Sequence, residues 1–275
     1  MAWSRVKNIL IAMLIAANAF LLVIYGITTW RENQYQDQVK ADLQAVAASL
    51  NITISEELVQ PEVQTLLPLQ VYADDAQDQL IAVQLLGECE PFSTEDGAVA
   101  FETTQGKLLL ASEGELDLTL YGKTAKTEHK ARAQVKKILK TLGQNARDLV
   151  VLPATEDARF RIKADLFASG MPVFNASLIF EFKTESLHVT GKRLLHHPQQ
   201  VSGTTIQELP GLLLRLFGYW QEQQQGAKTI TGIDLGYLTK NRTGKRMTVL
   251  PVWRVSENNA VWYISAVDGS VISAE

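Results

Sequence analysis

The chain has 275 residues, of which 46% are hydrophobic and 20% charged, and it carries a formal net charge of −4 at pH 7. A chain of this length and composition can bury a core, so general disorder is excluded, and its negative charge argues against a nucleic-acid partner. The single cysteine, Cys89, can form no internal disulfide, so the fold must be stable through its core alone.

The first element along the chain is predicted to be a membrane-spanning helix over residues 9–30. Residues 9–27 are almost entirely apolar and carry no charge, and as a helix they cover about 28 Å, close to the thickness of the hydrocarbon layer. A cleaved signal peptide is the alternative, because Ala17 and Ala19 satisfy the small-x-small cleavage rule. The apolar run continues through residues 20–24, which favours an uncleaved anchor.

Charged and aromatic residues at the ends of this run predict its orientation. Arg5 and Lys7 precede it, so the positive-inside rule predicts a cytoplasmic N-terminus over residues 1–8 and an extracytoplasmic body. Trp3 and Trp30 lie near the two ends, where amphipathic rings favour the headgroup region. We therefore expect Trp3, Arg5, Lys7 and Trp30 to anchor a single-pass protein at the two interfaces of the cell membrane.

A juxtamembrane helix is predicted over residues 31–52. Val39, Leu43, Val46 and Leu50 follow the spacing of one helical stripe, with polar residues between them. A narrow stripe of this kind packs either against its own domain or against the stalk helix of a partner in a coiled coil.

A first extracytoplasmic subdomain is predicted over residues 53–146. It contains a helix over residues 75–86, because Asp74 and Asp75 can cap its start and Gly87 can end it. Glycine-containing turns separate the strands that follow. The further predicted elements are strands over 99–103, 108–112 and 116–121 and a helix over 127–142.

A second extracytoplasmic subdomain, residues 147–275, repeats this plan. Its predicted elements are strands over 160–167, 172–182 and 187–195, a helix over 206–224, and strands over 229–238, 247–255, 261–266 and 270–273. The order predicts an α+β fold in which antiparallel sheets are each covered by helices, in two subdomains that meet near residue 146.

No catalytic pattern is present in the sequence. It lacks the nucleophile elbow, the zinc-protease helix, the phosphate-binding loop and the dinucleotide fingerprint, so we expect no enzyme, no cofactor and no small-molecule substrate. His196 and His197 are adjacent, and adjacent side chains on an extended segment point to opposite faces, so we interpret them as a surface loop rather than a metal site. Cys89 lies between Glu88 and Glu90, whose charge disfavours a thiolate, which indicates a bystander thiol.

Two helices present surfaces that each allow two interpretations. The helix over 127–142 and its approach are basic, and this face either attracts anionic wall polymers and lipid headgroups or is simply solvated. The helix over 206–224 is apolar on more than one side, which is typical of burial between a sheet and another element or of a partner interface. The basic residues are Lys123, Lys126, Lys130, Arg132, Lys136, Lys137 and Lys140. The apolar ones are Leu209, Leu212, Leu213, Leu214, Leu216, Phe217, Tyr219 and Trp220.

Two parts of the chain resemble a known family. Residues 3–7, Trp-Ser-Arg-Val-Lys, followed by an apolar span with Asn-Ala-Phe-Leu-Leu at 18–22, resemble the start of the YycI/YycH (WalI/WalH) family. This family comprises membrane-anchored regulators of the WalK/WalR (YycG/YycF) two-component system of Gram-positive bacteria. The C-terminal stretches that are similar to the close of the family's extracytoplasmic bodies, and to PepSY-like domains, are 234–237, 251–255, 261–264 and 268–272.

The resemblance implies a regulatory function. The span would contact the transmembrane helices of a sensor histidine kinase and of a YycH-like protein and modulate signalling to cell-wall genes, with Asn18, Phe20 and Leu21 as the contact residues. Asn18 also indicates a partner helix by itself, because an interhelical hydrogen bond in lipid is worth roughly 0.5–2 kcal/mol. The alternative is an anchored PepSY-like binding or inhibitor module that recognises a wall component or a secreted enzyme through the body.

Overall fold

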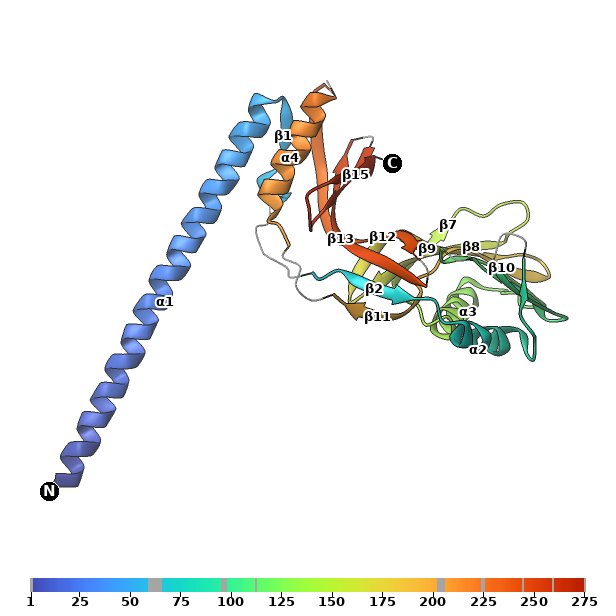
Figure 1. Ribbon diagram of the computed structural model, residues 1–275, viewed down its shortest axis with the longest axis horizontal. Helices are drawn as coiled ribbons and strands as arrows, with labels where there is room; N and C mark the ends of the chain where they lie inside the picture. The colour runs from blue at the N-terminus through green and yellow to red at the C-terminus, as the bar shows by residue number, and fades with distance from the viewer. Residues whose placement is uncertain are drawn as a thin grey trace. The chain divides into compact units, whose positions relative to one another are not determined.

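The computed structural model describes most of the chain (Figure 1). The described residues are 2–58, 66–94, 98–111, 113–201, 206–223, 226–243, 245–258 and 260–274. The last residues of two predicted elements, Ser112 and Gln224, lie outside them. Contacts within the chain define two compact units. One comprises Met1–Val63 and Glu208–Thr231, and the other comprises Gln64–Gln207 and Gly232–Glu275.

The first unit begins with one long helix, α1, which runs without interruption over Ala2–Ser49 (Figure 1, blue). Within the described residues it is the one helix long and apolar enough to cross a membrane. The apolar N-terminal helix predicted from the sequence is therefore confirmed, and it continues directly into the predicted juxtamembrane segment, because nothing between them breaks a helix.

The end of α1 packs against the rest of the first unit. There, β1 (Ile52–Ile54) pairs in parallel with the start of β12 (Lys228–Thr243), the short 3-10 helix η1 covers Glu56–Leu58, and α4 covers Leu209–Glu222. Leu43 and Ala47 of α1 are buried, whereas Val46 is 40% exposed, so this stripe packs within its own unit. Seven residues of α4 are buried, and these are Leu209, Pro210, Leu212, Leu213, Leu216, Phe217 and Trp220.

The second unit contains most of the strands. Its main strand order is β11-β2-β13-β12-β9-β10-β6-β5-β4-β3, with β7 attached through β8 to β9 and with β15 attached through β14 to β13. Apart from the parallel pairing of β9 with β12, the pairings described in this unit are antiparallel. The strands are β2 (Leu69–Tyr72), β3 (Phe92–Ser93), β4 (Val99–Thr103), β5 (Gly106–Leu110), β6 (Glu115–Tyr121), β7 (Asn145–Leu152), β8 (Phe160–Ala168), β9 (Met171–Phe182), β10 (Ser186–Lys192), β11 (His196–Gln200), β13 (Arg246–Glu257), β14 (Ala260–Ser265) and β15 (Val271–Ala274).

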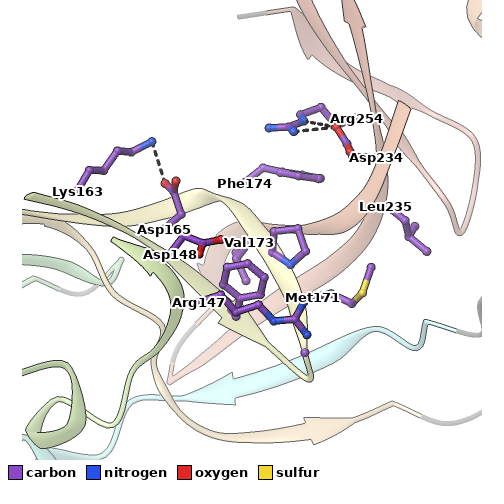
Figure 2. A pocket seen from close by; sticks show the side chains of 13 residues that line it. Arg147, Asp148, Lys163, Asp165, Met171, Val173, Phe174, Asp234, Leu235 and Arg254 are labelled. Carbon is purple, nitrogen blue, oxygen red and sulfur yellow. Dashed lines mark hydrogen bonds and ion pairs between the residues drawn. The ribbon is translucent and has the colours of Figure 1, made fainter. Parts of the chain in front are cut away.

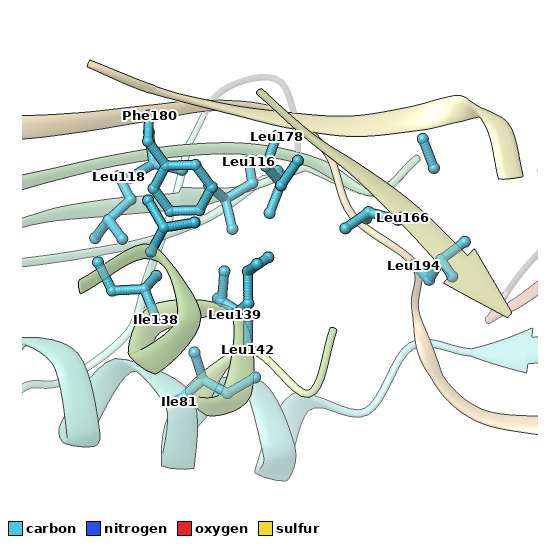
Figure 3. Packing of buried hydrophobic residues seen from close by; sticks show 14 of the residues in the cluster. Ile81, Leu116, Leu118, Ile138, Leu139, Leu142, Leu166, Leu178, Phe180 and Leu194 are labelled. Carbon is cyan, nitrogen blue, oxygen red and sulfur yellow. The ribbon is translucent and has the colours of Figure 1, made fainter. Parts of the chain in front are cut away.

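Two helices share the core of this unit with the strands. Helix α2 (Asp75–Leu86) begins at the predicted cap Asp74, and α3 (Glu128–Thr141) begins at Thr127, whose hydroxyl oxygen accepts the amide N–H of Lys130. Figure 3 shows their apolar side chains beneath the strand residues. The core includes Ile81, Ile138, Leu139 and Leu142 from the helical side and Leu116, Leu118, Leu166, Leu178 and Phe180 from the strands. The protein is therefore a mixed α+β structure with a large sheet.

Four strands of this unit are absent from the sequence prediction: β2, β3, β7 and β11. β7 has no alternation of buried and exposed residues, and Val150 and Val151 are both exposed, so its sequence lacks the period-two signal. β11 has the polar sequence His-His-Pro-Gln-Gln and pairs with β2 through an irregular register. In addition, β6 pairs with β10, so strands on both sides of residue 146 belong to one sheet.

Candidate functional site

A cavity of about 440 Å³ opens in the second unit where β7, β8, β9, β12 and β13 contribute side chains (Figure 2). This volume is in the range of small-molecule sites, about 300–1,000 Å³. Its apolar lining residues are Phe167, Met171, Pro172, Val173, Phe174 and Leu235. Its charged lining residues are Arg147, Asp148, Lys163, Asp165, Asp234 and Arg254.

The cavity wall formed by β7 contains a β-bulge. Ala146 pairs with Leu166 and Leu149 pairs with Ala164, so two residues of β7, at positions 147 and 148, stand opposite one residue of β8. A bulge of this kind bends the strand locally and re-aims its side chains. Both bulged residues, an arginine and an aspartate, line the cavity.

The wall formed by β9 contains a second irregularity. Asp165 of β8 pairs with Ser177 and Phe167 pairs with Pro172, so the four residues 173–176 lie opposite a single residue of β8. At this point β9 pairs with β12 instead. The departure of β9 from β8 opens the space that the cavity occupies, and two residues of the departing segment, Val173 and Phe174, line it.

Four of the charged lining residues form two ion pairs across the cavity surface. Lys163 Nζ lies 2.8 Å from Asp165 Oδ1, and Arg254 Nη2 lies 2.8 Å from Asp234 Oδ2 (Figure 2). Because these pairs are partly exposed, each contributes little to stability, about 0–1 kcal/mol. Their main consequence is a fixed arrangement of charge around the apolar floor of the cavity, which Met171, Pro172 and Phe174 line.

Both arginines of the cavity also lie over phenylalanine rings. The guanidinium carbon of Arg254 is 4.5 Å from the centroid of Phe174, and that of Arg147 is 5.2 Å from the centroid of Phe167. A cation–π contact of this kind helps to hold the guanidinium in place and leaves the N–H groups at its edge for other partners. Among the described residues, Arg147 forms no ion pair.

The Asp-Leu-Gly-Tyr motif at 234–237 forms part of this wall. A Cβ atom on Gly236 would lie 2.7 Å from the ring of Phe174 and from the carbonyl oxygen of Pro172, so only glycine allows this approach. The Tyr237 hydroxyl donates a hydrogen bond of 2.9 Å to the carbonyl oxygen of Leu67, and burial raises the pKa of Tyr237 to about 12. The motif therefore both packs the strand and supports the aromatic floor of the cavity.

Sequence reasoning interpreted the C-terminal motifs as strands and assigned them no binding role. In the structure, Asp234 of the Asp-Leu-Gly-Tyr motif accepts a hydrogen bond from Arg254 of the Trp-Arg-Val stretch. The signal for this ion pair in the sequence was an acidic and a basic residue at exposed positions of two adjacent strands. In the same region Trp253 pairs with Ile264 and Trp262 pairs with Val255, so the two tryptophans occupy diagonal positions on paired strands.

The residues predicted to contact a partner span lie on α1. Phe20 and Leu21 are 64% and 61% exposed, and Asn18 is exposed too. One N–H of the Asn18 amide donates a hydrogen bond of 3.0 Å to the carbonyl oxygen of Leu14, one turn earlier. In the described structure this is the one hydrogen bond that the Asn18 side chain makes, so its carbonyl oxygen stays available to a second helix.

The predicted interface anchors lie on the same helix. Lys7 and Trp30 have exposed side chains, and Trp30 is 60% exposed. The backbone of α1 includes Trp3 and Arg5, whose side chains lie outside the described part of the structure. Near each end of the apolar run, a basic and an aromatic residue thus share one continuous helix, and their role as interface anchors stays a prediction.

The histidine pair begins the strand β11 and is not a loop, and of the two residues His196 joins a buried charge cluster whereas His197 is exposed at the surface, as predicted. His196 Nε2 lies 2.8 Å from Asp78 Oδ1, and Arg193 Nη2 lies 2.8 Å from the same oxygen. Arg193 is 1% exposed, and this burial lowers its pKa. His197 instead contacts Asp74, and this hydrogen bond lowers the pKa of that carboxyl group. These contacts could not be predicted from local sequence patterns, because the partners are more than 100 residues apart.

Comparisons with known proteins give distant similarity only. No family model and no curated protein matches the chain. Among solved structures, the chain is similar to an uncharacterized protein from Eubacterium rectale, with 12% identity, a TM-score of 0.45 and coverage of 76% of this chain and 86% of that one. It is also similar to the C-terminal domain of YpeB from Bacillus megaterium, with 11% identity, a TM-score of 0.33 and coverage of 74% and 97%. Similarity at this level identifies neither a family nor a function.

Proposed function

We propose that the protein is a membrane-anchored regulator, without enzymatic activity, that modulates a sensor histidine kinase through contacts between transmembrane helices. In this proposal α1 crosses the cell membrane once, with a cytoplasmic N-terminus and an extracytoplasmic body. The resemblance of residues 3–7 and 18–22 to the YycI/YycH family supports the kinase of the WalK type and a YycH-like protein as the partners.

The observation that carries this proposal is the surface of the span. Its apolar side chains are exposed all round the helix, and Asn18 is the strongly polar residue among them. The bond from Asn18 to Leu14 satisfies one N–H and leaves the amide oxygen and the second N–H without a partner in the described structure. In lipid, such groups are satisfied by another helix more readily than by the hydrocarbon.

Co-purification of the full chain with the kinase from membranes tests this proposal. Asn18→Leu removes the amide and should weaken the association about 2- to 30-fold, which corresponds to an interhelical hydrogen bond of roughly 0.5–2 kcal/mol. Met13→Leu, an apolar exchange at another exposed position of the span, is the control and should have no effect. Unchanged association of the Asn18→Leu variant, with normal insertion, would refute the role of this residue.

The second candidate function is recognition by the extracytoplasmic body, as a binding or inhibitor module for a wall component or a secreted enzyme. The cavity favours it, because two strand irregularities and a positioned arginine surround an apolar floor. A pull-down with residues 31–275 separates the two candidates. Full partner binding without the span favours recognition by the body, and loss of binding favours helix contacts.

A further inference from the structure

The charges around the cavity are balanced. Arg147, Lys163 and Arg254 face Asp148, Asp165 and Asp234, so three cations accompany three carboxylates. A polyanion or a polycation would meet like charges on entry, and like-charge contacts weaken binding. A ligand that carries both signs, separated by a short distance, has no such conflict.

Two neighbouring charges are available to such a ligand. Lys163 and Arg254 are each occupied by an aspartate, whereas Arg147 and Asp148 form no ion pair among the described residues. The bulge in β7 places these two residues side by side at the cavity. One cation and one carboxylate are thus presented together to the cavity.

Arg147 is suited to bind a carboxylate. Its guanidinium lies over the ring of Phe167, which holds the plane in position while the N–H groups remain at its edge. A planar guanidinium binds a carboxylate through two parallel hydrogen bonds, a geometry that an ammonium group does not offer. Asp148, the next residue, can accept hydrogen bonds from an amine or amide N–H of the same ligand.

The floor beside these charges is apolar. Met171, Pro172 and Phe174 line it, and Phe174 is held by Arg254 at 4.5 Å on one side and by the ring of Tyr263 at 5.8 Å. A supported aromatic and a flexible methionine together accommodate an aliphatic or aromatic side chain of variable shape.

We propose that this cavity binds a short peptide by its free C-terminal end. The terminal carboxylate binds Arg147, the backbone N–H groups bind Asp148, and an apolar terminal side chain packs against Met171 and Phe174. The inference rests on the second function proposed above, recognition by the body, and it is independent of the helix contacts. It names the ligand class for that function.

Isothermal titration of the full chain in phosphatidylcholine nanodiscs with the tripeptide Gly-Gly-Leu tests the proposal. The peptide amide of the same sequence lacks the carboxylate and should bind at least tenfold more weakly, because the charged fork–fork contact is lost. Free leucine, which lacks the peptide N–H groups, should also bind more weakly than the tripeptide. Equal affinity for the tripeptide and its amide, or no binding at millimolar concentration, would overturn the proposal.

A pair of arginine variants assigns the effect to the cavity. Arg147→Gln should weaken binding of Gly-Gly-Leu at least tenfold and remove the preference over the amide. Arg159 is a matched control, because it lies over Phe160 at 5.6 Å but does not line the cavity. Arg159→Gln should leave the affinity unchanged, and an equal loss in both variants would contradict the assignment.

The failure of this proposal is distinguishable from the failure of the function on which it rests. If Gly-Gly-Leu does not bind while residues 31–275 still capture a partner, the ligand class is wrong and recognition by the body stands. If that fragment captures nothing and the peptide also fails to bind, both are wrong. Association with the kinase through α1 should be the same in the Arg147→Gln variant and in the unmodified chain.

Discussion

At the scale of single residues, the buried pair of Asp78 and Arg193 is the most sensitive point of the body. Asp78→Asn leaves the guanidinium, 1% exposed, without its carboxylate, and breaking a buried pair from one side costs about 3 kcal/mol or more. Urea denaturation should show this loss in the free energy of unfolding. Asp75→Asn is the control, because the pair of Asp75 with Lys245 is largely exposed, and its effect should stay below about 0.5 kcal/mol.

Asp268 makes the stability of the body depend on pH in the acidic range. The Ser265 hydroxyl and then the backbone N–H and hydroxyl of Ser270 hold the pKa of Asp268 at about 2, against 3.8 for the unfolded chain. Because the folded pKa is the lower one, the stabilisation is complete above about pH 4 and is lost as the pH falls to 2. After a discount for its exposure it is about 1 kcal/mol. Denaturation of the wild type and of Asp268→Asn should differ at pH 6 and converge near pH 2; a constant difference would contradict this.

At the scale of elements, the first turn of α3 depends on its cap. The Thr127 hydroxyl accepts the Lys130 N–H at 3.3 Å and so satisfies one of the backbone donors that have no partner within the helix. Thr127→Ala should therefore lower the free energy of unfolding by about 1 kcal/mol. Thr127→Ser keeps the hydroxyl and should cost only a few tenths. A similar loss in both variants would show that the methyl group, and not the cap, is responsible.

The elements that the sequence predicted well are those whose signals are local. Helix α2 starts at its predicted cap, α3 starts within one residue of its predicted beginning, and β4 covers the predicted residues, because capping and alternation depend on residues only a few positions apart. β7 and β11 were missed, since exposed or polar strands are stabilised only by their neighbours. The cavity could not be predicted from the sequence for the same reason, because the two register shifts that form it exist only once β7, β8 and β9 have paired.

At the scale of the whole molecule, the chain consists of a long apolar helix and an α+β body, to which we assign different functions. The helix α1 exposes its apolar side chains along the predicted span and buries Leu43 and Ala47 only near its end. The body buries an extensive core that needs no disulfide. Anchoring and lateral contact therefore belong to α1 in our proposal, whereas ligand recognition belongs to the cavity in the body.

The single cysteine of the chain provides the most direct test of this arrangement. In intact cells, a membrane-impermeant maleimide should label Cys89, which is partly exposed, and the labelled protein should remain in the membrane after an alkaline carbonate wash. Burial raises the pKa of the Cys89 thiol, so the labelling is followed over time and compared with a Cys89→Ala variant. Labelling only after lysis, or recovery of a shortened protein in the medium, would contradict an intact tether with an extracytoplasmic body.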